Sequence, residues 1–451
     1  MIPRGISPAA LLTGIGITLV LLTAGGAVAL VCPLPYLPRI SLFMISICLA
    51  GLLWLGAVAL VRGGRLPRRA VWIVLSAAVA MRVISFATPP LLSSDIYRYV
   101  WDGRVEWAGI NPYRYIPIDP ELAFLRDDAV YPHINRAEYA HTIYAPAAQA
   151  VFALAAAVAP GVYGMKAVMA GFDILAIAAL MALLRLAGRH PAELLIYAWL
   201  PLPVWEFVGN AHIDAVTAGL LTVALLSAAR GRQVPVGIAL AAAALTKYLP
   251  IVVVPAFWRP LGWRVPAAFI ATLAALYLPY AGAGWQVLGS LGVYTHEEGF
   301  GTGHGVFLLQ ALATVVELPS WAFYAYAAAA VGVLAVIGWN FAFVSEQPAG
   351  VARRIEVQAR QAAILGGVLL VAISPHYPWY FGWLAPLACL APIPSVLWML
   401  AAAPLLAHGS VEYLAVPAAV YVPAMALAVH DLYKLRAGTR TIVVPAARNV
   451  G

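Results

Sequence analysis

The side chains best suited to chemistry lie in residues 89–143, the one long polar stretch of the chain. Eight of the nineteen acidic residues fall between Asp95 and Glu138, together with five arginines and many aromatic residues. Carboxylates, guanidiniums and aromatic rings side by side could bind a polar group that is tethered to a lipid. An amphipathic surface helix with local ion pairs is the alternative.

The start of this stretch favours a short helix at the membrane interface. The two serines before it could cap the helix, and Pro112 would end it. On such a helix Asp95, Arg98 and Asp102 share one face, because they stand at i, i+3 and i+7. Aromatic residues of this segment suit the lipid boundary; they are Tyr99, Trp101 and Trp107.

A second polar group is Asn210–Asp214, with the sequence NAHID, preceded one turn earlier by Glu206. His212 and Asp214 are costly near a membrane unless they are paired or functional. The alternative is a polar helix cap provided by Asn210 or Asp214.

Two more polar sites interrupt apolar runs. Lys247 lies within GIALAAAALTKYLPIVVVP, where a lysine normally has a specific partner or ligand, such as a phosphate. Snorkelling to the interface is its alternative.

Prolines break the helix around His376 in SPHYPWY, and non-helical backbone at membrane depth normally lines a cavity. The other side chains of interest there are Tyr377, Trp379 and Tyr380, for which an interfacial aromatic belt is the alternative.

A glycine-rich loop, residues 295–305, offers candidate ligands for a divalent cation: His296, Glu297, Glu298 and His304. Their spacing matches no specific zinc pattern. A solvated loop without metal is therefore the favoured interpretation, and a divalent cation stays a possible cofactor.

The elements that position these residues are membrane helices. The chain is 63% hydrophobic and 10% charged, whereas soluble domains carry roughly 25% charged residues. Continuous apolar runs such as 10–31, 40–61 and 320–344 are long enough to cross a bilayer, and they do not alternate as barrel strands do. We expect an all-α polytopic membrane protein, a single domain over residues 1–451.

The basic residues predict the orientation. The net charge is +8, but the arginines form short clusters between apolar runs, which is the positive-inside pattern and not a nucleic-acid surface. The clusters are 62–69, 185–189, 230–232, 259–264, 353–360 and the tail from 434 to 448. With these in the cytoplasm, both termini are cytoplasmic and all the polar groups above fall on the outer face, including the long loops 89–143 and 282–305.

Three regions complicate the count of crossings. Residues 145–184 and 306–344 each hold two apolar runs where one crossing is needed, so one run of each pair should enter without crossing. Residues 234–258 have basic flanks at both ends and suit a helical hairpin with its tip at the outer face. We expect 12–14 crossings plus partial helices.

The chain resembles the GT-C superfamily of integral membrane glycosyltransferases, and most of all its bacterial polyprenyl-phosphate-mannose-dependent mannosyltransferase branch. The resemblance covers residues 90 to 385. The matching residues are Asp95, Tyr97–Tyr99, Trp101–Arg104, Gly109–Tyr113, Tyr144–Pro146, Asn210–Asp214, Thr246, Lys247, Pro250 and His376–Tyr380. The chain departs from the family pattern in two ways. Two extra membrane spans precede the span that leads into the acidic loop. In addition, the sequence is Tyr-Ala-Pro where relatives often have Tyr-Pro-Pro.

The resemblance implies an inverting transfer of a hexose, such as mannose, from a polyprenyl-phosphate donor to a glycan or lipid acceptor, on the outer face of the inner membrane. It implies that Asp95, or less favourably Asp102, is the general base. Cations would bind the leaving phosphate: Lys247, Arg98, Arg104 and His376. Glu206, His212 and Asp214 could bind sugar hydroxyls or tune the base, and Trp101, Trp379 and Tyr380 could stack on the sugar. The remaining substrate-binding candidates are Tyr99, Asn111, Tyr113, Asn210 and Tyr377.

Three other functions stay open. A transporter or flippase for a lipid-linked sugar would show internal repeats and paired broken helices, and no repeat is visible. A ligase of the same fold would transfer a glycan from a lipid diphosphate. A non-catalytic assembly subunit would tolerate loss of the polar residues.

Overall fold

The chain folds into a bundle of helices, and no strand occurs among the described residues. The computed structural model describes residues 7–32, 39–64, 66–259, 262–297, 299, 305–345, 348–407 and 414–440, and it is 77% helical. This confirms the predicted all-α polytopic class. The α-helices are α1 (Pro8–Val31), α2 (Arg39–Arg62), α3 (Ala70–Ala87), α4 (Asp95–Trp107), α5 (Pro146–Val158), α6 (Val162–Leu186), α7 (Leu195–Ala198), α8 (Asp214–Ala229), α9 (Gln233–Ala244), α10 (Arg264–Tyr277), α11 (Leu291–Glu297), α12 (Phe307–Ala313), α13 (Ala322–Trp339), α14 (Val351–Ile373), α15 (Ala385–Leu390), α16 (Pro394–Ala402) and α17 (Ala415–Arg440).

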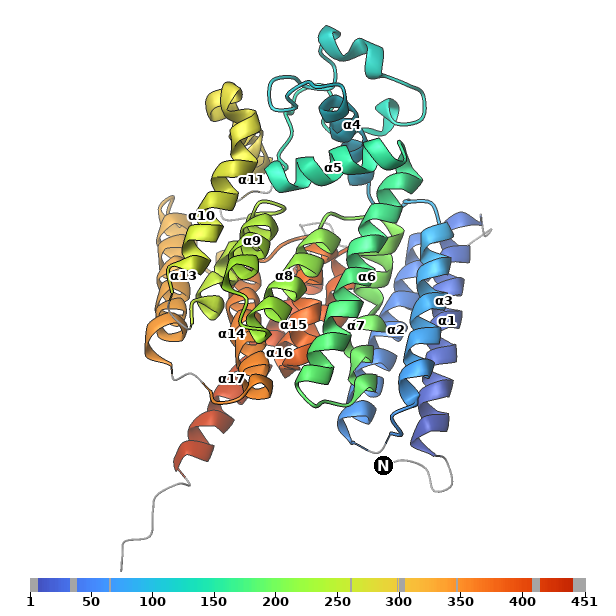
Figure 1. Cartoon of the computed structure of the whole chain (residues 1–451), viewed down its shortest axis with the longest axis vertical. Coiled ribbons are helices and arrows are strands. Elements are labelled where there is room, and N and C mark those ends of the chain that lie inside the picture. The colour runs from blue at the N-terminus through green and yellow to red at the C-terminus, as the bar shows by residue number, and fades with distance from the viewer. Residues whose placement is uncertain are drawn as a thin grey trace, which may run out of the picture.

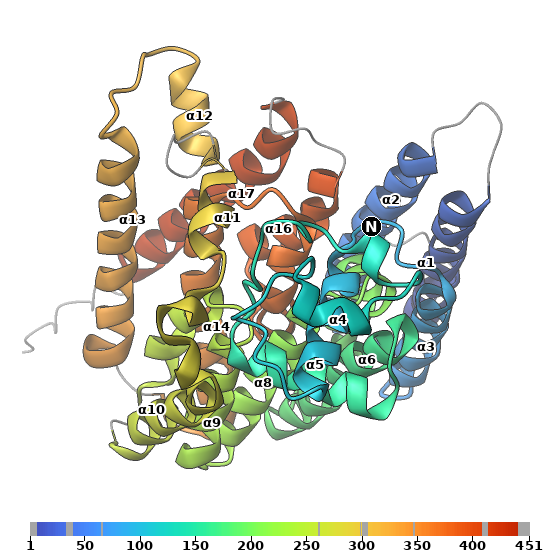
Figure 2. The same ribbon diagram turned by 90° about the horizontal axis from the view of Figure 1, so that it is seen from above.

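Short 3-10 and π segments join these helices: η1 (Pro120–Leu125), η2 (Tyr131–His133), η3 (Pro191–Leu194), η4 (Pro203–Gly209), η5 (Leu249–Phe257), η6 (Leu278–Leu288), η7 (Asn340–Val344), η8 (Pro378–Leu384) and η9 (Ala403–Ala407). Figures 1 and 2 show α1–α3 on one side of the bundle and α10–α13 on the other. Between them, α8, α14 and α15 form the centre.

Seven helices in the described part of the chain are long and apolar enough to cross a membrane, or eight if the bent pair η4 and α8 counts as one span. Four shorter apolar helices of 10–17 residues accompany them. This is fewer than the 12–14 crossings expected, because several apolar runs that look continuous in sequence are broken into short helices. Of the two runs in 145–184, α6 is the long span and α5 lies across its upper end (Figure 1).

The region 234–258 folds as the predicted hairpin. α9 runs to Ala244, the chain turns at Thr246–Tyr248, and η5 returns to Phe257. Arg232 and Arg259 mark the two ends, and both line the same small cavity. The basic flanks therefore lie together, as the charge rule requires.

One buried ion pair ties α3 to the bundle centre. Arg82 Nε donates to Asp173 of α6 at 2.6 Å, and the Tyr197 hydroxyl donates to the same carboxylate at 2.8 Å. A buried charge is strongly unfavourable unless it is paired and hydrogen-bonded. These contacts allow two charged residues to remain inside an apolar bundle.

A cap of short helices and loops covers one end of the bundle. α4, α5 and η1 form it, and α10 and α11 rise beside it (Figure 1). α4 packs closely on α5, because a Cβ at Gly103 would lie 2.3 Å from the Phe152 carbonyl oxygen. Of the two serines expected to cap α4, Ser93 accepts from the Asp95 backbone N–H, and Ser94 makes no side-chain cap.

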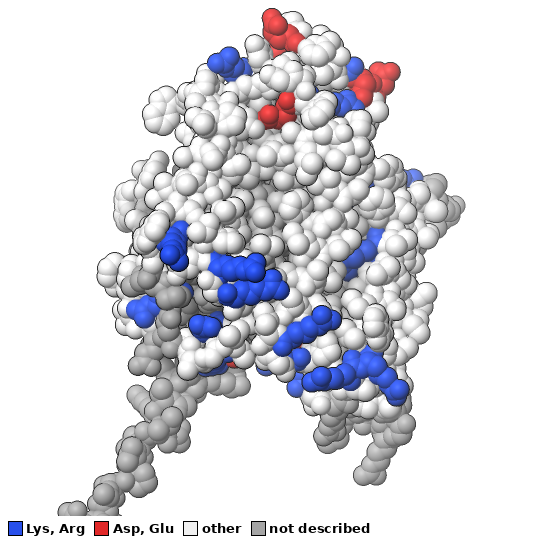
Figure 3. All heavy atoms as spheres, in the orientation of Figure 1, with Lys and Arg blue, Asp and Glu red and all other residues white. Residues whose placement is uncertain are grey.

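Charge divides the molecule between its two ends. Figure 3 shows Asp and Glu gathered over the cap, and most Lys and Arg of that face in the lower half.

Candidate active site

A cavity of about 850 Å³ lies between the cap and the bundle. Five segments far apart in the sequence line it: 92–99, 135–145, 246–249, 290–297 and 373–380, with Ile213 between them. Each of the five polar groups singled out in the sequence contributes to the cavity or to its immediate support. Large size and a small number of converging polar groups are typical of a ligand site.

Asp95 is the first residue of α4, and seven residues separate it from the end of α3. Its carboxylate is half-buried, lines the cavity and accepts one hydrogen bond, from Asn135 Nδ2 at 2.9 Å. One bond leaves most of the lone pairs of a carboxylate available. α3 thus anchors Asp95 rigidly, and an oxygen of the Asp95 carboxylate can face a ligand in the cavity.

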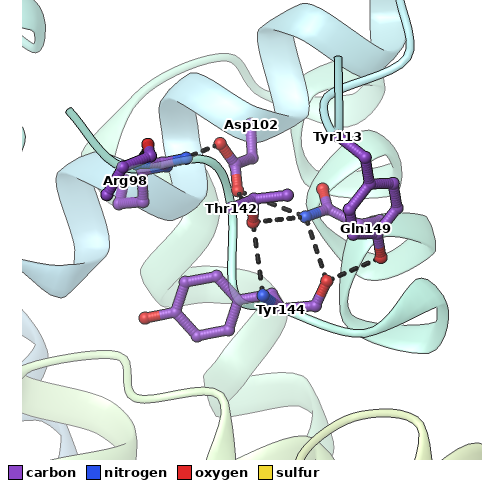
Figure 4. Close-up of polar contacts among 7 residues, drawn as sticks. Arg98, Asp102, Tyr113, Thr142, Tyr144 and Gln149 are labelled. Carbon is purple, nitrogen blue, oxygen red and sulfur yellow. Dashed lines mark hydrogen bonds and ion pairs between the residues drawn. The ribbon is translucent and has the colours of Figure 1, made fainter. Parts of the chain in front are cut away.

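Asp102 has a different environment, shown in Figure 4. It is 2% exposed and does not line the cavity. It accepts from Arg98 Nε at 2.8 Å, from Thr142 Oγ1 at 2.6 Å and from Gln149 Nε2 at 3.2 Å. These bonds fasten α4 to the 140–144 segment and to α5, so Asp102 holds the floor of the cap in place.

Arg98 serves both the network and the cavity. Besides Asp102 it donates to the Ala140 carbonyl at 3.1 Å, and part of it lines the cavity beside Tyr99. Its charge is thus balanced by Asp102 and its position is fixed from two sides.

A break in a membrane helix supports the cavity, and Ile213 of this break lines it. η4 and α8 meet at a bend of 113°, and Ala211 between them has a φ of +57°. Non-glycine residues rarely adopt such a φ, and the strain tends to occur at functional sites. The bend brings Glu206 of η4 to His212, with the Oε2 and Nδ1 atoms 2.9 Å apart, and Asn210 donates to the same oxygen at 3.1 Å.

Lys247 enters the cavity from the tip of the α9–η5 hairpin. Its ammonium lies 3.0 Å from Asp214, which is fully buried at the start of α8, and 3.6 Å from the centre of the Tyr380 ring. An ammonium over an aromatic face is attracted by the ring quadrupole. Because Lys247 has three N–H donors, it can bind Asp214 and still present a donor to an anion in the cavity.

A stack of aromatic rings lines the cavity on the α14–η8 side. Trp379 lies 4.0 Å from His212 on one face and 4.7 Å from Tyr377 on the other, ring centre to ring centre. His376, Tyr377, Trp379 and Tyr380 all line the cavity. The prolines around His376 therefore produce the cavity-lining irregular backbone expected from the sequence.

Seven of the predicted substrate-binding residues do not line the cavity: Arg104, Asn111, Tyr113, Glu206, Asn210, His212 and Asp214. The first three belong to the cap. Arg104 pairs with Asp127 at 2.8 Å. The Asn111 side chain accepts from the Tyr113 backbone N–H in a turn, and the Tyr113 hydroxyl donates to the Tyr144 carbonyl at 2.7 Å. These contacts shape the cap.

Several cavity residues were not predicted. Asn135 binds Asp95, and Arg136 pairs with Glu297 of α11 at 2.6 Å. His141 lines the cavity, and its buried Nδ1 has no hydrogen-bond partner in the described part of the chain. The only sequence signal for these residues was the polarity of 89–143 as a whole.

The metal candidates that the structure describes are His296 and Glu297, at the end of α11. Among the described residues no group of three or more His, Cys, Asp or Glu could hold a metal ion. Glu297 is bound to Arg136 and to the Tyr139 hydroxyl. Glu298 and His304 lie outside the described residues.

Comparison with known proteins gives the family. A family model described as alpha-(1->6)-mannopyranosyltransferase, N-terminal domain, matches residues 11–261, more than half of the chain. No curated protein and no solved structure matches. The matched range contains Asp95, Asp214 and Lys247, and the aromatic stack of 376–380 lies beyond it. The chain belongs to the alpha-(1->6)-mannopyranosyltransferase family, and it is a polytopic membrane mannosyltransferase.

Proposed function

We propose that this enzyme transfers mannose from a polyprenyl-phosphate donor to a glycan or lipid acceptor, with inversion at the sugar, on the extracytoplasmic face of the inner membrane. The observation that carries the proposal is that the half-buried carboxylate of Asp95 and the ammonium of Lys247 line one cavity between the membrane helices and the cap. A base for the acceptor and a cation for a leaving phosphate are the two groups that this reaction needs.

In the proposed reaction Asp95 accepts the proton of the acceptor hydroxyl while that oxygen attacks the anomeric carbon. The bond from this carbon to the phosphate oxygen breaks, and the polyprenyl phosphate leaves as an anion. A phosphate leaves without being protonated, so no second carboxyl is needed as an acid. Asp95 also stabilises the positive charge that develops on the sugar.

Lys247 would bind the phosphate, and His376 lies close by in the same lining. Asp214 holds Lys247 in place and keeps the site neutral before the donor enters. The attraction between an ammonium and a phosphate anion is stronger in a low-dielectric site than in water. The phosphate would therefore be held best as its charge grows in the transition state.

The lipid tail would lie against the apolar part of the cavity. Leu249, Leu291, Val293, Phe323 and Ile373 line it and come from the hairpin, α11, α13 and α14. Burial of isoprenoid units there would add affinity without touching the reacting atoms. The Tyr377 and Trp379 rings line the cavity and offer aromatic surface against which a sugar can pack.

The charge distribution supports the proposed orientation. Basic residues gather at the end of the bundle opposite the cap (Figure 3), and that end would be cytoplasmic. The cap and the cavity would then be extracytoplasmic, where polyprenyl-linked sugars meet cell-envelope acceptors.

The test is transfer by the full-length protein in nanodiscs, with radiolabelled polyprenyl-phosphate-mannose and crude membrane glycans. Asp95→Asn should reduce transfer by about 10²-fold or more, the usual contribution of a general base, and should leave donor binding intact. Asp128→Asn is the matched control, because Asp128 is an exposed acid of the same loop.

Full activity of Asp95→Asn would remove Asp95 as the base. Transfer only from a polyprenyl-diphosphate glycan would establish the ligase reaction instead. A bound but unreactive mannose donor would point to a different sugar.

A further inference from the structure

A second cavity lies at the other end of the bundle. Its volume is about 110 Å³. The end of α8, the start of α9, the end of η5, and the starts of α10 and α14 surround it. No residue of the mannosyl-transfer site lines it.

This cavity is rich in cationic and amide side chains. Arg232, Arg259 and Arg354 line it, together with three glutamines at 233, 358 and 361. No carboxylate lines it among the described residues. The one acid of α14, Glu356, is already bound to Arg353 at 2.9 Å and to Arg360 at 3.3 Å on the exposed side of the helix.

The arginines retain unused donors. Arg259 donates to the carbonyls of Ala342 and Phe343 at the end of η7. The buried Nε of Arg354 has no hydrogen-bond partner, and Arg232 makes no side-chain ion pair or hydrogen bond, within the part of the chain that the structure covers. A buried cationic donor without an acceptor is unfavourable, so an anion that accepts from it would stabilise the cavity.

The surroundings place the cavity at the level of lipid headgroups. Exposed aromatic residues stand beside it: Trp263 before α10, Trp339 at the end of α13, and Phe343 in η7. Exposed tryptophans mark the membrane–water interface, and basic cavities between helices at the cytoplasmic side are suited to anionic lipid headgroups.

We propose that this cavity binds a phosphate group, with the headgroup of an anionic phospholipid as its principal source and free phosphate as the other. The volume suffices for that group: one water needs about 10–15 Å³ of cavity volume, and the cavity offers about 110 Å³. Arginine forks and glutamine amides provide the N–H donors that phosphate oxygens accept from.

Three elements connect this cavity to the mannosyl-transfer site. α8 ends at the cavity and begins with Asp214, α9 begins at the cavity and leads to Lys247, and α14 begins at the cavity and leads to His376. A bound phosphate would hold the inner ends of these three helices together.

The test measures lipid binding to the purified full-length protein by native mass spectrometry. The probes are phosphatidylglycerol and phosphatidylcholine with the same acyl chains, and inorganic phosphate as competitor. We expect phosphatidylglycerol to bind more tightly than phosphatidylcholine, and Arg354→Gln and Arg232→Gln each to weaken it roughly fivefold. Arg360→Gln is the matched control, because it removes a charge from α14 outside the cavity.

Arg232 is exposed, so its variant carries the test if Arg354→Gln does not fold. Equal binding of both lipids, with phosphate binding lost in Arg354→Gln, would identify free phosphate as the ligand. Equal binding of both lipids without any phosphate binding, or an equal loss in Arg360→Gln, would overturn the proposal.

Discussion

Two aspartates two turns apart on α4 have opposite environments. Asp95 accepts one side-chain hydrogen bond and lines the cavity, whereas Asp102 accepts three and is buried. A carboxylate that accepts several bonds from a cation and from neutral donors is held in place and has little capacity left for a reacting proton. The surroundings of each side chain therefore separate a candidate base from a residue that maintains the cap.

Lys247→Met tests the phosphate site. The variant should weaken binding of the polyprenyl-phosphate donor by roughly tenfold or more, since hydrogen bonds to charged groups contribute about 1.5–3 kcal/mol. It also leaves Asp214 buried without its partner, which lowers stability for an unrelated reason. Titration of the donor against protein in nanodiscs gives the affinity.

The double variant Lys247→Met with Asp214→Asn separates the two effects. It should regain thermal stability, because no uncompensated charge remains, but it should not regain donor binding. If donor binding returned with stability, Lys247 would have only a structural role.

At the scale of elements, the contact of α4 with α5 controls the shape of the cap. The backbones approach at Gly103, and the Asp102 network joins the same two helices from the other side. Small residues at such a crossing permit close packing that any larger side chain would disturb.

Gly103→Ala should therefore destabilise the cap by about 1–3 kcal/mol, the usual cost of overpacking. The methyl group would meet a carbonyl oxygen that cannot move aside without shifting α5. The melting temperature in detergent is the measurement. Gly171→Ala is the control, because nothing lies within 4 Å of its Cβ position; equal melting temperatures for both variants would contradict the close contact.

Glu106 gives the cap a pH dependence. Burial raises the pKa of Glu106 to about 7; the Tyr280 hydroxyl opposes this rise and the Asp102 carboxylate adds to it. The folded protein then holds a proton that the unfolded chain releases near pH 4.5, so stability falls as pH rises from about 4.5 to about 7. Between about pH 4.5 and 7 the slope of melting temperature against pH should be more negative in the wild type than in Glu106→Gln; identical slopes would contradict this assignment.

The sequence predicted the polar groups but only part of their geometry. Local spacing, charge and proline act within a few residues of the chain. They predicted three features: the helical face of 95–102, the hairpin at 234–258 and the break at His376. Asn135 was missed because it lies 40 residues from Asp95 in the chain. Arg104, Asn111 and Tyr113 were expected at the substrate, and nothing local indicated that turns and ion pairs would direct them elsewhere.

At the scale of the whole molecule, the two ends differ in charge and in the cavities they hold. The number of crossings was the weakest prediction, because hydropathy does not distinguish a helix that crosses from two short ones that meet at a break. The separation of basic from acidic ends was predicted well, because positive charges are difficult to carry across a membrane.

Membrane-impermeant thiol labelling in intact cells tests the proposed orientation. In a background without Cys32, Cys48 and Cys389, Phe124→Cys in the cap should react at once, because Phe124 is 69% exposed. Arg353→Cys at the opposite end should react only after the membrane is permeabilised. The reverse pattern would place the cavity in the cytoplasm.

The pairing of Lys247 with Asp214 also bears on how the protein enters the membrane during synthesis. A lone lysine in an apolar segment resists insertion, yet the α9–η5 hairpin carries Lys247 at its tip. Because α8 precedes this hairpin in the chain, Asp214 is synthesised before Lys247, and the two can enter their final environment as a neutral pair. Membrane insertion of Lys247, the residue that would bind the donor phosphate, thus depends on α8, the helix synthesised just before the hairpin.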